Sequence, residues 1–429
     1  MNSPNSVARR VRRALVPLLG STALVATMVA APTATADEHW KVVASGLDNP
    51  RHLSVGPKGD LFVAEAGRGG GGPCIDSPEG GDSCFGRTGA ITRVSLDKGK
   101  GKKKGKQERV LSKLPSHAVE GGAQAIGPHD VIVEGSKKLV FTVGLGANPD
   151  VRTLPGNKPF KDMGTLRSAT IGSKRTTLIA DIAKHEARKN PIHDPDSNPV
   201  GFIRHGSDYV VADAGGNTLV EVSKRGRTKT LAVFEDQLAF APPFLGLPPG
   251  TQIPSQAVPT SVVKGPGGAL YVSQLTGFPF EKGLAKVYKV DRQGAISVYA
   301  SGLTNVTDLA FGPGNVLYAV QLVTEGLLTA ETGPLGSVVA IPKGGGDSHA
   351  VVAANLFAPY GIAINGKTAY VTTGSVAPGA GHGRHRQGRH SWRAVPRRSG
   401  HRDLAQGGHA HRRQDRHRHR GPPGLPRPG

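Results

Sequence analysis

Short runs of alternating apolar and polar residues, separated by glycine-rich turns, recur along this chain. One stretch, "NPRHLSVGPKGDLFVAEAG" at residues 49–67, holds two such runs around a Gly-Pro-Lys-Gly turn. A second stretch, "APYGIAINGKTAYVTTG" at residues 358–374, has the same plan. Because side chains alternate between the two faces of a strand, this period of two predicts β-strands, and the turn between the runs predicts a hairpin.

The hairpin pattern occurs six times. The copies begin at Pro50, Pro128, Pro199, Pro259, Val306 and Pro359. Most copies are followed by a third and a fourth apolar run, such as "AKVYKV" and "ISVYASGL". We therefore predict an all-β fold, a six-bladed β-propeller of four-stranded antiparallel blades. A pair of β-sandwiches with chance similarity between the hairpins is the alternative.

The two ends of the repeated region predict how the ring closes. The segment "HWKVVASGL", residues 39–47, precedes the first copy and resembles the fourth strands of the other units. Pairing this segment with the last unit would close the ring and remove two free sheet edges. The last unit has two strands but no recognisable third strand after "TTGSVAPGAG". We expect a ring closed by the N-terminal strand, with the last blade incomplete.

Residues 1–36 have the pattern of a secretory signal peptide. Four arginines precede an apolar run from Ala14 to Ala31, and "ATA" at residues 34–36 offers small residues for cleavage. We interpret the segment as a Sec-type signal, with a retained membrane anchor as the alternative. No other stretch of the sequence is long and apolar enough to span a bilayer. The prediction is a secreted, extracellular protein whose propeller occupies residues 37–380.

The formal net charge of +22 lies mostly outside the predicted propeller core. Residues 382–429 contain thirteen Arg, no Lys and two Asp, and six Lys fall between residues 98 and 106. With the four signal-peptide arginines set aside as well, the remaining body is close to neutral. A specific nucleic-acid partner is therefore not expected.

Residues 381–429 form an Arg/His/Gly/Pro-rich segment that holds eight of the sixteen His residues. Its composition offers too few apolar residues for a packed core, so we predict a disordered tail. We interpret it as a frameshift product of a GC-rich gene, because the break falls where a third strand is expected. A His-rich tail that binds metal or polyanions is the alternative.

Cys74 and Cys84 are the two cysteines of the chain, and they lie in a glycine-rich loop. In a secreted protein, such a pair predicts a disulfide. A reactive thiol pair would more often have the spacing Cys-x-x-Cys.

Strand direction predicts that one face of the propeller carries most of the loop elaboration. The long segments expected on this face are residues 68–88, 146–165, 184–197, 236–257 and 322–335. The same face receives the starts of the first strands and the ends of the second strands, and it is a natural place for a ligand. The candidate ligand-binding residues at its central mouth are His52, Glu65, His129, Asp130, Asp213, Gln274, Asp308 and Gln321.

Some of these side chains suggest a divalent metal such as calcium. The candidate ligands are His52, Glu65, His129, Asp130 and Asp308. Carboxylates and imidazole suit Ca, Mn or Zn. The alternative is that they cap turns and satisfy backbone groups at the strand ends.

Several motifs resemble those of a known family. The stretches "PCIDSPEGGDSCFGRTGAITRV", "DSNPVGF", "DAGGNTLVEV", "ALYVSQLTGFPF" and "GLTNVTDLAFGPGNVLYAV" are similar to the ScyD/ScyE family of secreted actinobacterial and cyanobacterial proteins. The resemblance covers residues 40–380. It implies a six-bladed propeller like those of the NHL and gluconolactonase-like group, and it supplies no catalytic residues.

Two classes of function follow from the sequence. The first is a binding or scaffold module, monomeric, whose partner is a small molecule, a glycan or an extracellular protein. The second is an enzyme, either a metal-dependent lactonase-like hydrolase or a quinone-dependent sugar oxidoreductase, since such enzymes use similar propellers. The sequence leaves the choice between them open.

Overall fold

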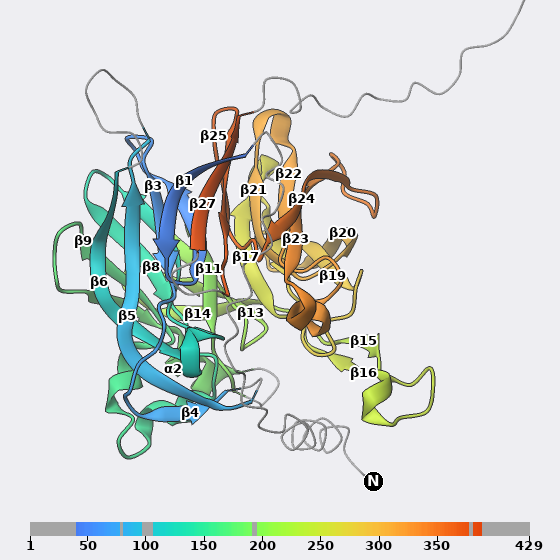
Figure 1. Cartoon of the computed structure of the whole chain (residues 1–429), viewed down its shortest axis with the longest axis horizontal. Helices are drawn as coiled ribbons and strands as arrows, with labels where there is room; N and C mark the ends of the chain where they lie inside the picture. Colours follow the sequence, from blue (N-terminus) through green and yellow to red (C-terminus); the bar gives the residue numbers. More distant parts are fainter. Residues whose placement is uncertain (1–39, 78–79, 97–105, 191–194, 377–380, 388–429) are drawn as a thin grey trace, which may run out of the picture. The chain divides into compact units, whose positions relative to one another are not determined.

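Short strands joined by tight turns make up most of the described chain. The computed structural model describes residues 40–77, 80–96, 106–190, 195–376 and 381–387 (Figure 1). These residues belong to one unit, residues 1–394. The predicted signal peptide and most of the predicted tail lie outside the described residues. Within the described part, no helix is long and apolar enough to cross a membrane.

The strands form antiparallel sheets in which sequence neighbours pair. Five sheets have four strands, and one has five. The five-stranded sheet comprises β2 (Pro50–Val55), β3 (Leu61–Glu65), β4 (Cys74–Asp76), β5 (Asp82–Val94) and β6 (Gln107–Ala118). The next two are β7 (Pro128–Glu134), β8 (Lys138–Val143), β9 (Thr165–Thr170) and β10 (Thr177–Asp181), then β11 (Pro199–His205), β12 (Asp208–Asp213), β13 (Thr218–Val222) and β14 (Thr228–Val233).

The remaining four-stranded sheets complete the series. They are β17 (Pro259–Lys264), β18 (Leu270–Gln274), β19 (Ala285–Val290) and β20 (Ile296–Leu303); β21 (Val306–Phe311), β22 (Leu317–Gln321), β23 (Leu335–Ile341) and β24 (Ala350–Phe357); and β25 (Ile362–Asn365), β26 (Thr368–Thr373), β27 (Gly381–Gln387) and β1 (Trp40–Leu47). The predicted all-β propeller with four-stranded antiparallel blades is confirmed.

The core lies between neighbouring sheets. Successive residues of a strand point to opposite faces, so each sheet packs on both of its neighbours. Val211 of β12 belongs to the apolar cluster with the β7–β10 sheet, and the adjacent Val210 belongs to the cluster with the β17–β20 sheet. The first strands β2, β7, β11, β17, β21 and β25 contact one another in a closed cycle.

The N-terminal strand closes the ring, as the sequence predicts. Strand β1 is the outer strand of the sheet that contains β25 and β26. The prediction that this last blade is incomplete is wrong, because β27 lies between β26 and β1 and pairs with both. The first seven residues of the predicted tail thus supply the missing strand. Strand pairing uses backbone groups, so a segment of unsuitable composition can still fill this position.

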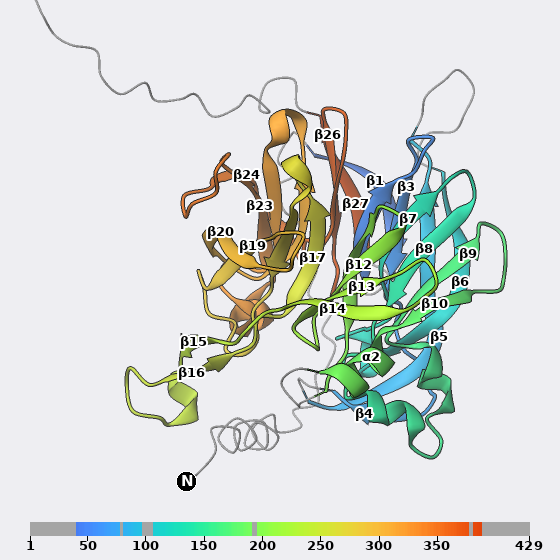
Figure 2. The same cartoon turned by 180° about the vertical axis from the view of Figure 1, so that it is seen from behind.

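The long connecting segments contain ordered structure of their own. The link at 184–197 overlaps the helix α2 (Ile182–Lys189), and the link at 236–257 forms a separate two-stranded hairpin, β15 (Gln237–Phe240) with β16 (Gln252–Ser255). The 3-10 helices are η1 (Glu120–Gly122), η2 (Pro149–Thr153), η3 (Lys158–Asp162), η4 (Pro243–Leu245), η5 (Pro266–Gly268), η6 (Pro313–Asn315) and η7 (Leu327–Thr332). β4, α2 and the β15–β16 hairpin lie towards the same end of the sheets in both views (Figures 1 and 2).

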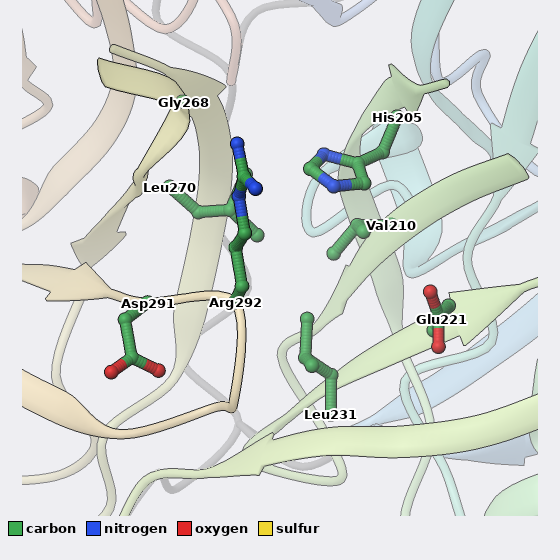
Figure 3. Close-up of a pocket in the computed structure, with 8 residues that line it drawn as sticks. All are labelled: His205, Val210, Glu221, Leu231, Gly268, Leu270, Asp291 and Arg292. Carbon is green, nitrogen blue, oxygen red and sulfur yellow. The ribbon is translucent and has the colours of Figure 1, made fainter. Parts of the chain in front are cut away.

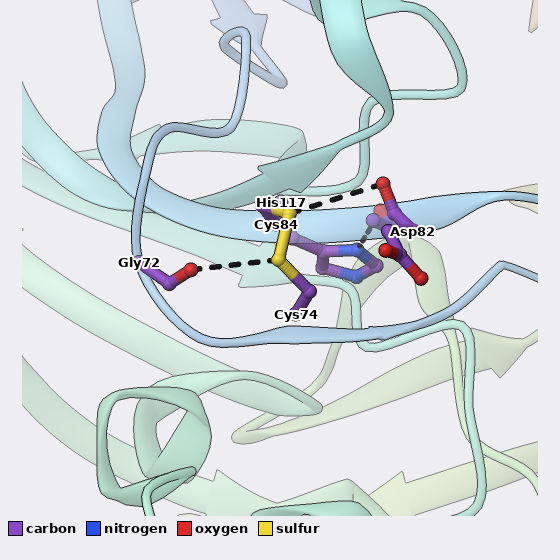
Figure 4. Close-up of a disulfide and its surroundings, with 6 residues drawn as sticks. Gly72, Cys74, Asp82, Cys84 and His117 are labelled. Atoms are coloured by element: carbon purple, nitrogen blue, oxygen red, sulfur yellow. Dashed lines mark hydrogen bonds between the residues drawn. A yellow bond between two sulfur atoms is a disulfide. The ribbon is translucent and has the colours of Figure 1, made fainter.

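The loop predicted at 68–88 is a strand pair closed by the expected disulfide. Cys74 of β4 lies opposite Cys84 of β5, and their sulfur atoms are bonded. The imidazole of His117 is drawn beside the disulfide in Figure 4. Its Nδ1 is 2.7 Å from Ser83 Oγ, and its Nε2 is 2.8 Å from the Leu145 carbonyl oxygen. The prediction of the disulfide is confirmed.

The role of β27 can be tested by truncation. A chain that ends at Val376 lacks β27 and leaves the facing edges of β26 and β1 without a partner, whereas a chain that ends at Gln387 keeps all pairs. Each buried backbone group left without a hydrogen bond costs about 1–3 kcal/mol. We expect the shorter chain to have a Tm lower by roughly 5 °C or more. Calorimetry of both chains checks this, and equal Tm values would contradict it.

Candidate functional site

The starts of the first strands are held together by side chains that bond to neighbouring backbone. In the described sheets, each first strand has a strand neighbour on one side. Hydroxyl groups satisfy carbonyl oxygens on the other side. The pairs are Thr142 Oγ1 to Val200 O at 2.6 Å, Thr260 Oγ1 to Val306 O at 2.7 Å, Thr307 Oγ1 to Tyr360 O at 2.6 Å and Thr372 Oγ1 to Arg51 O at 2.8 Å.

Two aspartates satisfy backbone amides in the same way. Asp130 of β7 accepts a hydrogen bond from the Phe202 N–H at 3.0 Å, and Asp308 of β21 accepts one from the Ile362 N–H at 2.8 Å. The second oxygen of Asp308 accepts a hydrogen bond from Ser261 Oγ at 2.7 Å. Each carboxylate therefore joins its sheet to the next one along the chain.

His52 lies between these two carboxylates. Its Nδ1 is 3.7 Å from Asp130 Oδ2, and its Nε2 is 3.9 Å from Asp308 Oδ1 and 3.0 Å from the Thr307 carbonyl oxygen. The side chain is 2% exposed. Burial alone would lower the pKa of His52, but the charges of Asp308 and Asp130 outweigh it and raise the pKa to about 9. The imidazole is therefore a buried cation at neutral pH.

Two glycines make room for this histidine. A Cβ atom at Gly201 would lie 2.7 Å from the Thr260 carbonyl oxygen and 3.3 Å from Cε1 of His52. A Cβ atom at Gly361 would lie 2.7 Å from Cα of His52. Both glycines occupy the position in their repeats that His52 occupies in the first one. This position of the repeat thus holds a charged residue in three copies and a small residue in the other three: His52, Asp130 and Asp308, and Gly201, Ser261 and Gly361.

Arg51 and Tyr360 lie next to this cluster, with the Tyr360 ring centre 5.4 Å from that of His52. The Arg51 guanidinium lies 4.7 Å from the centre of the Tyr360 ring and donates hydrogen bonds to the carbonyl oxygens of Ser375 and Ala125. His129 is also buried here, and neither of its ring nitrogens has a hydrogen-bond partner among the described residues. Burial, followed by the charge of Arg51, holds the pKa of His129 well below 6.5, so its imidazole is neutral.

The structure brings together His52, His129, Asp130 and Asp308, but not the predicted site residues at the ends of the second strands. The four residues at the ends of the second strands instead bond within their own sheets or the adjoining connections. Glu65 accepts a hydrogen bond from the Asp48 N–H, Asp213 from the Asn198 N–H, Gln274 from the Lys286 N–H and Gln321 from the Thr304 N–H. Their arrangement matches the alternative of strand-end capping.

Glu65 also has a cationic partner that sequence reasoning missed. Arg109 of β6 donates to Glu65 Oε2 at 2.8 Å and to Asp48 at 2.8 Å, and the Glu65 carboxylate also accepts from Thr92. A cavity of about 380 Å³ lies beside this group, with Gln107 and Glu108 in its lining. Arg109 lies 44 positions from Glu65 in the sequence, and the pairing of β3 with β5 and of β5 with β6 brings the two residues together.

A second buried acid group surrounds the turn after β12. Asp213 accepts a hydrogen bond from Ser197 Oγ at 2.8 Å, and Glu186 of α2 accepts one from Thr218 Oγ1 at 2.8 Å. Burial, together with the charge of Glu186, raises the pKa of Asp213 to about 8. Burial also raises the pKa of Glu186. Hydrogen bonds from neighbouring hydroxyls and amides only partly offset these shifts.

These groups do not have the arrangement of a metal centre. Within the described residues, no set of three or more His, Cys, Asp or Glu side chains is placed to hold a metal ion. Glu65 bonds within its own sheet, and the oxygens of Asp130 and Asp308 already accept hydrogen bonds. A cavity of about 30 Å³ between the β11–β14 and β17–β20 sheets has room for only about one or two waters (Figure 3).

No family model matches the chain, and no curated protein matches it. Solved structures with some likeness include virginiamycin B lyase from Staphylococcus aureus, 12% identical, covering 81% of this chain and 99% of its own, with a TM-score of 0.41. A gluconolactonase from Xanthomonas campestris is 12% identical over 63% of this chain and 79% of its own (TM-score 0.38). A chain of a nidogen/laminin complex is 15% identical over 67% and 84% (TM-score 0.39). Likeness at these TM-scores determines neither family nor activity.

Because His52 is a buried cation, we expect the folded protein to lose stability as the pH rises. Its folded-state pKa of about 9 lies above its ordinary value of 6.5. The stabilisation is therefore fully present below pH 6.5 and is lost as the pH rises through about 9. We expect the free energy of unfolding to fall by about 3 kcal/mol over this range. Urea unfolding from pH 6 to 9.5 measures it. His52→Gln should remove this fall, and His185→Gln, which changes a buried histidine on α2, should keep it. An unchanged fall in His52→Gln would refute the assignment.

The raised pKa of Asp213 predicts a second decline in stability, at lower pH than the decline expected from His52. Its folded-state pKa of about 8 lies above the ordinary 3.8, so the folded chain keeps a proton that the unfolded chain releases. Stability should fall as the pH rises from about 4 to 8. In Asp213→Asn, this decline should be smaller by at least about 1 kcal/mol. Asp208→Asn, on the same strand but partly exposed, is the control. Unfolding curves at pH 5 and 7.5 that respond alike in both variants would exclude this role.

Proposed function

We propose that this protein is an extracellular binding or scaffold module that contacts its partner through the loop-rich end of the propeller. The observation that carries the proposal is a contrast between the centre and this end. At the centre, the charged side chains bond to one another and to backbone. At the loop-rich end, large apolar side chains are exposed. The charged groups maintain the fold, and the exposed surface is available to a partner.

The number of blades, the signal peptide and the family are part of the same proposal. We infer that the five-stranded sheet serves as the first of six blades, because β2 takes its place in the cycle of first strands. A signal peptide at residues 1–36 would deliver the chain to the exterior, and the Cys74–Cys84 disulfide is consistent with that location. We also propose membership of the ScyD/ScyE family, on the sequence motifs alone.

The exposed apolar side chains are concentrated on the β15–β16 hairpin, residues 237–255, which we call the apolar hairpin. Leu238, Phe240, Phe244 and Leu247 are between 40% and 59% exposed. The hairpin rests on the β18–β19 connection: the Phe240 N–H donates to Glu281 at 2.8 Å, and the Phe244 and Phe278 rings are 6.2 Å apart. Lys282 of this connection in turn bonds to Glu325 of the β22–β23 connection.

Retention on cells tests the proposal. The purified secreted protein is mixed with washed cells of the strain that produces it, and the bound fraction is measured after centrifugation. We expect retention of the wild type and a loss of about tenfold in the triple variant Leu238→Ser/Phe240→Ser/Phe244→Ser. Asp308→Asn is assayed in parallel for hydrolysis of lactones with added Ca²⁺, Mn²⁺ or Zn²⁺. Metal-dependent turnover by the wild type that Asp308→Asn abolishes, without retention on cells, would overturn the binding role in favour of the hydrolase.

A further inference from the structure

The apolar hairpin has an apolar surface on the side that faces away from the sheets. Because β15 and β16 pair with Leu238 opposite Pro254 and Phe240 opposite Gln252, these four side chains share one face. All four are exposed, whereas Ala239 and Ile253 on the other face are buried. In both views, the hairpin extends away from the larger sheets (Figures 1 and 2). One face holds it to the protein, and the other has no cover among the described residues.

The hairpin carries no charge along its whole length. Residues 237–255 contain no Asp, Glu, Lys, Arg or His. The charged side chains that bond to it, Glu281 and Lys286, do so at Phe240 and Gln237 in the strand β15, not at the tip. Inserting the tip into an apolar medium would therefore remove no charge from water, which is the largest cost of such a transfer.

The backbone of the tip is also largely satisfied from within. Pro242, Pro243, Pro248 and Pro249 have no N–H to satisfy. The N–H groups of Ala241, Leu245, Gly246 and Thr251 donate to carbonyl oxygens of the same hairpin, over 2.8 to 3.1 Å. In hydrocarbon, each unsatisfied backbone group costs several kcal/mol, so internal pairing is the condition that lipid imposes on a segment. Water imposes no such condition, because it can bond to any backbone group that is left unpaired.

We propose that the apolar hairpin docks this protein on an uncharged lipid surface, with Leu238, Phe240, Phe244 and Leu247 buried among lipid chains at the interface. The inference rests on the proposed function and names the partner of the same surface. The exposed apolar area argues against a second copy of the chain as the partner. The side chains of Leu238, Phe240, Phe244 and Leu247 together expose roughly 400 Å². A stable protein interface needs about 800 Å² from each partner. Interfacial insertion has no such threshold, since binding strength grows with the apolar area that enters the lipid.

Vesicle binding tests the lipid proposal. The full secreted protein is mixed with phosphatidylcholine vesicles, which carry no net charge, and the bound fraction is measured by flotation. We expect binding that stays within about twofold between 50 and 500 mM NaCl, because no charged residue of the hairpin takes part. The triple variant Leu238→Ser/Phe240→Ser/Phe244→Ser should bind at least about tenfold more weakly.

A matched variant tests whether vesicle binding depends on apolar side chains of the hairpin or on the total exposed apolar area of the protein. Leu178, Val298 and Val351 are 49% to 63% exposed on the outer strands β10, β20 and β24. Replacing these three residues by serine removes similar apolar surface elsewhere and should leave vesicle binding unchanged. Equal loss in both triple variants would overturn the proposal. So would binding that appears only with anionic lipid and falls steeply with salt, because basic segments would then be responsible.

The two assays together distinguish the lipid proposal from the broader one. Retention on cells that depends on the hairpin, without vesicle binding, would refute the lipid surface and leave the binding function standing. Sedimentation velocity could also show dimers that the hairpin variant abolishes. This result would identify a second copy of the chain as the partner and would also refute the lipid proposal. Vesicle binding without retention on cells would refute the proposed function. Circular dichroism of every variant verifies that the fold is intact.

Discussion

The unpaired inner edge of each first strand is the constraint on which this structure depends. A strand with a neighbour on one side leaves N–H and C=O groups on the other side, and in the interior each of these groups needs a partner. Here the partners are threonine hydroxyls, the carboxylates of Asp130 and Asp308, and the imidazole of His52. Because these partners come from neighbouring sheets, satisfying the edge also joins the sheets into a ring.

This requirement explains why polar and charged residues recur at the starts of the first strands. Such residues in a concave mouth suggest a catalytic or metal site when they are seen in a sequence. In the folded chain, His52, Asp130 and Asp308 lie together as a buried charge group, and the carboxylate oxygens accept hydrogen bonds. Removing one member would leave the others uncompensated in a medium of low polarity, which is costly. The buried ion group therefore joins the sheets that carry its members and their hydrogen-bond donors.

In our proposal the charged centre serves the fold, and the variable segments at the loop-rich end carry the function. The disulfide loop at Cys74, the helix α2 and the apolar hairpin are additions to a repeated four-stranded unit. Each is fastened by its own interactions, such as the bond from the Phe240 N–H to Glu281. A rigid ring can support such additions because they alter none of its strand pairs. The exposed face of the hairpin is consistent with a structural centre and functional additions at the loop-rich end.

Much of the architecture was determined by the sequence alone. Period-two alternation and glycine turns are local signals, so the strands, the repeated unit, the closing strand β1 and the Cys74–Cys84 disulfide could be predicted. Strand β27 could not, because its arginines and histidines have no strand pattern and its place depends on backbone groups that β26 and β1 leave open. The partners of the site residues were equally hidden. Only tertiary structure could decide that His52 meets Asp308, or Glu65 meets Arg109, since these contacts join residues far apart in the chain and depend on how the sheets are placed.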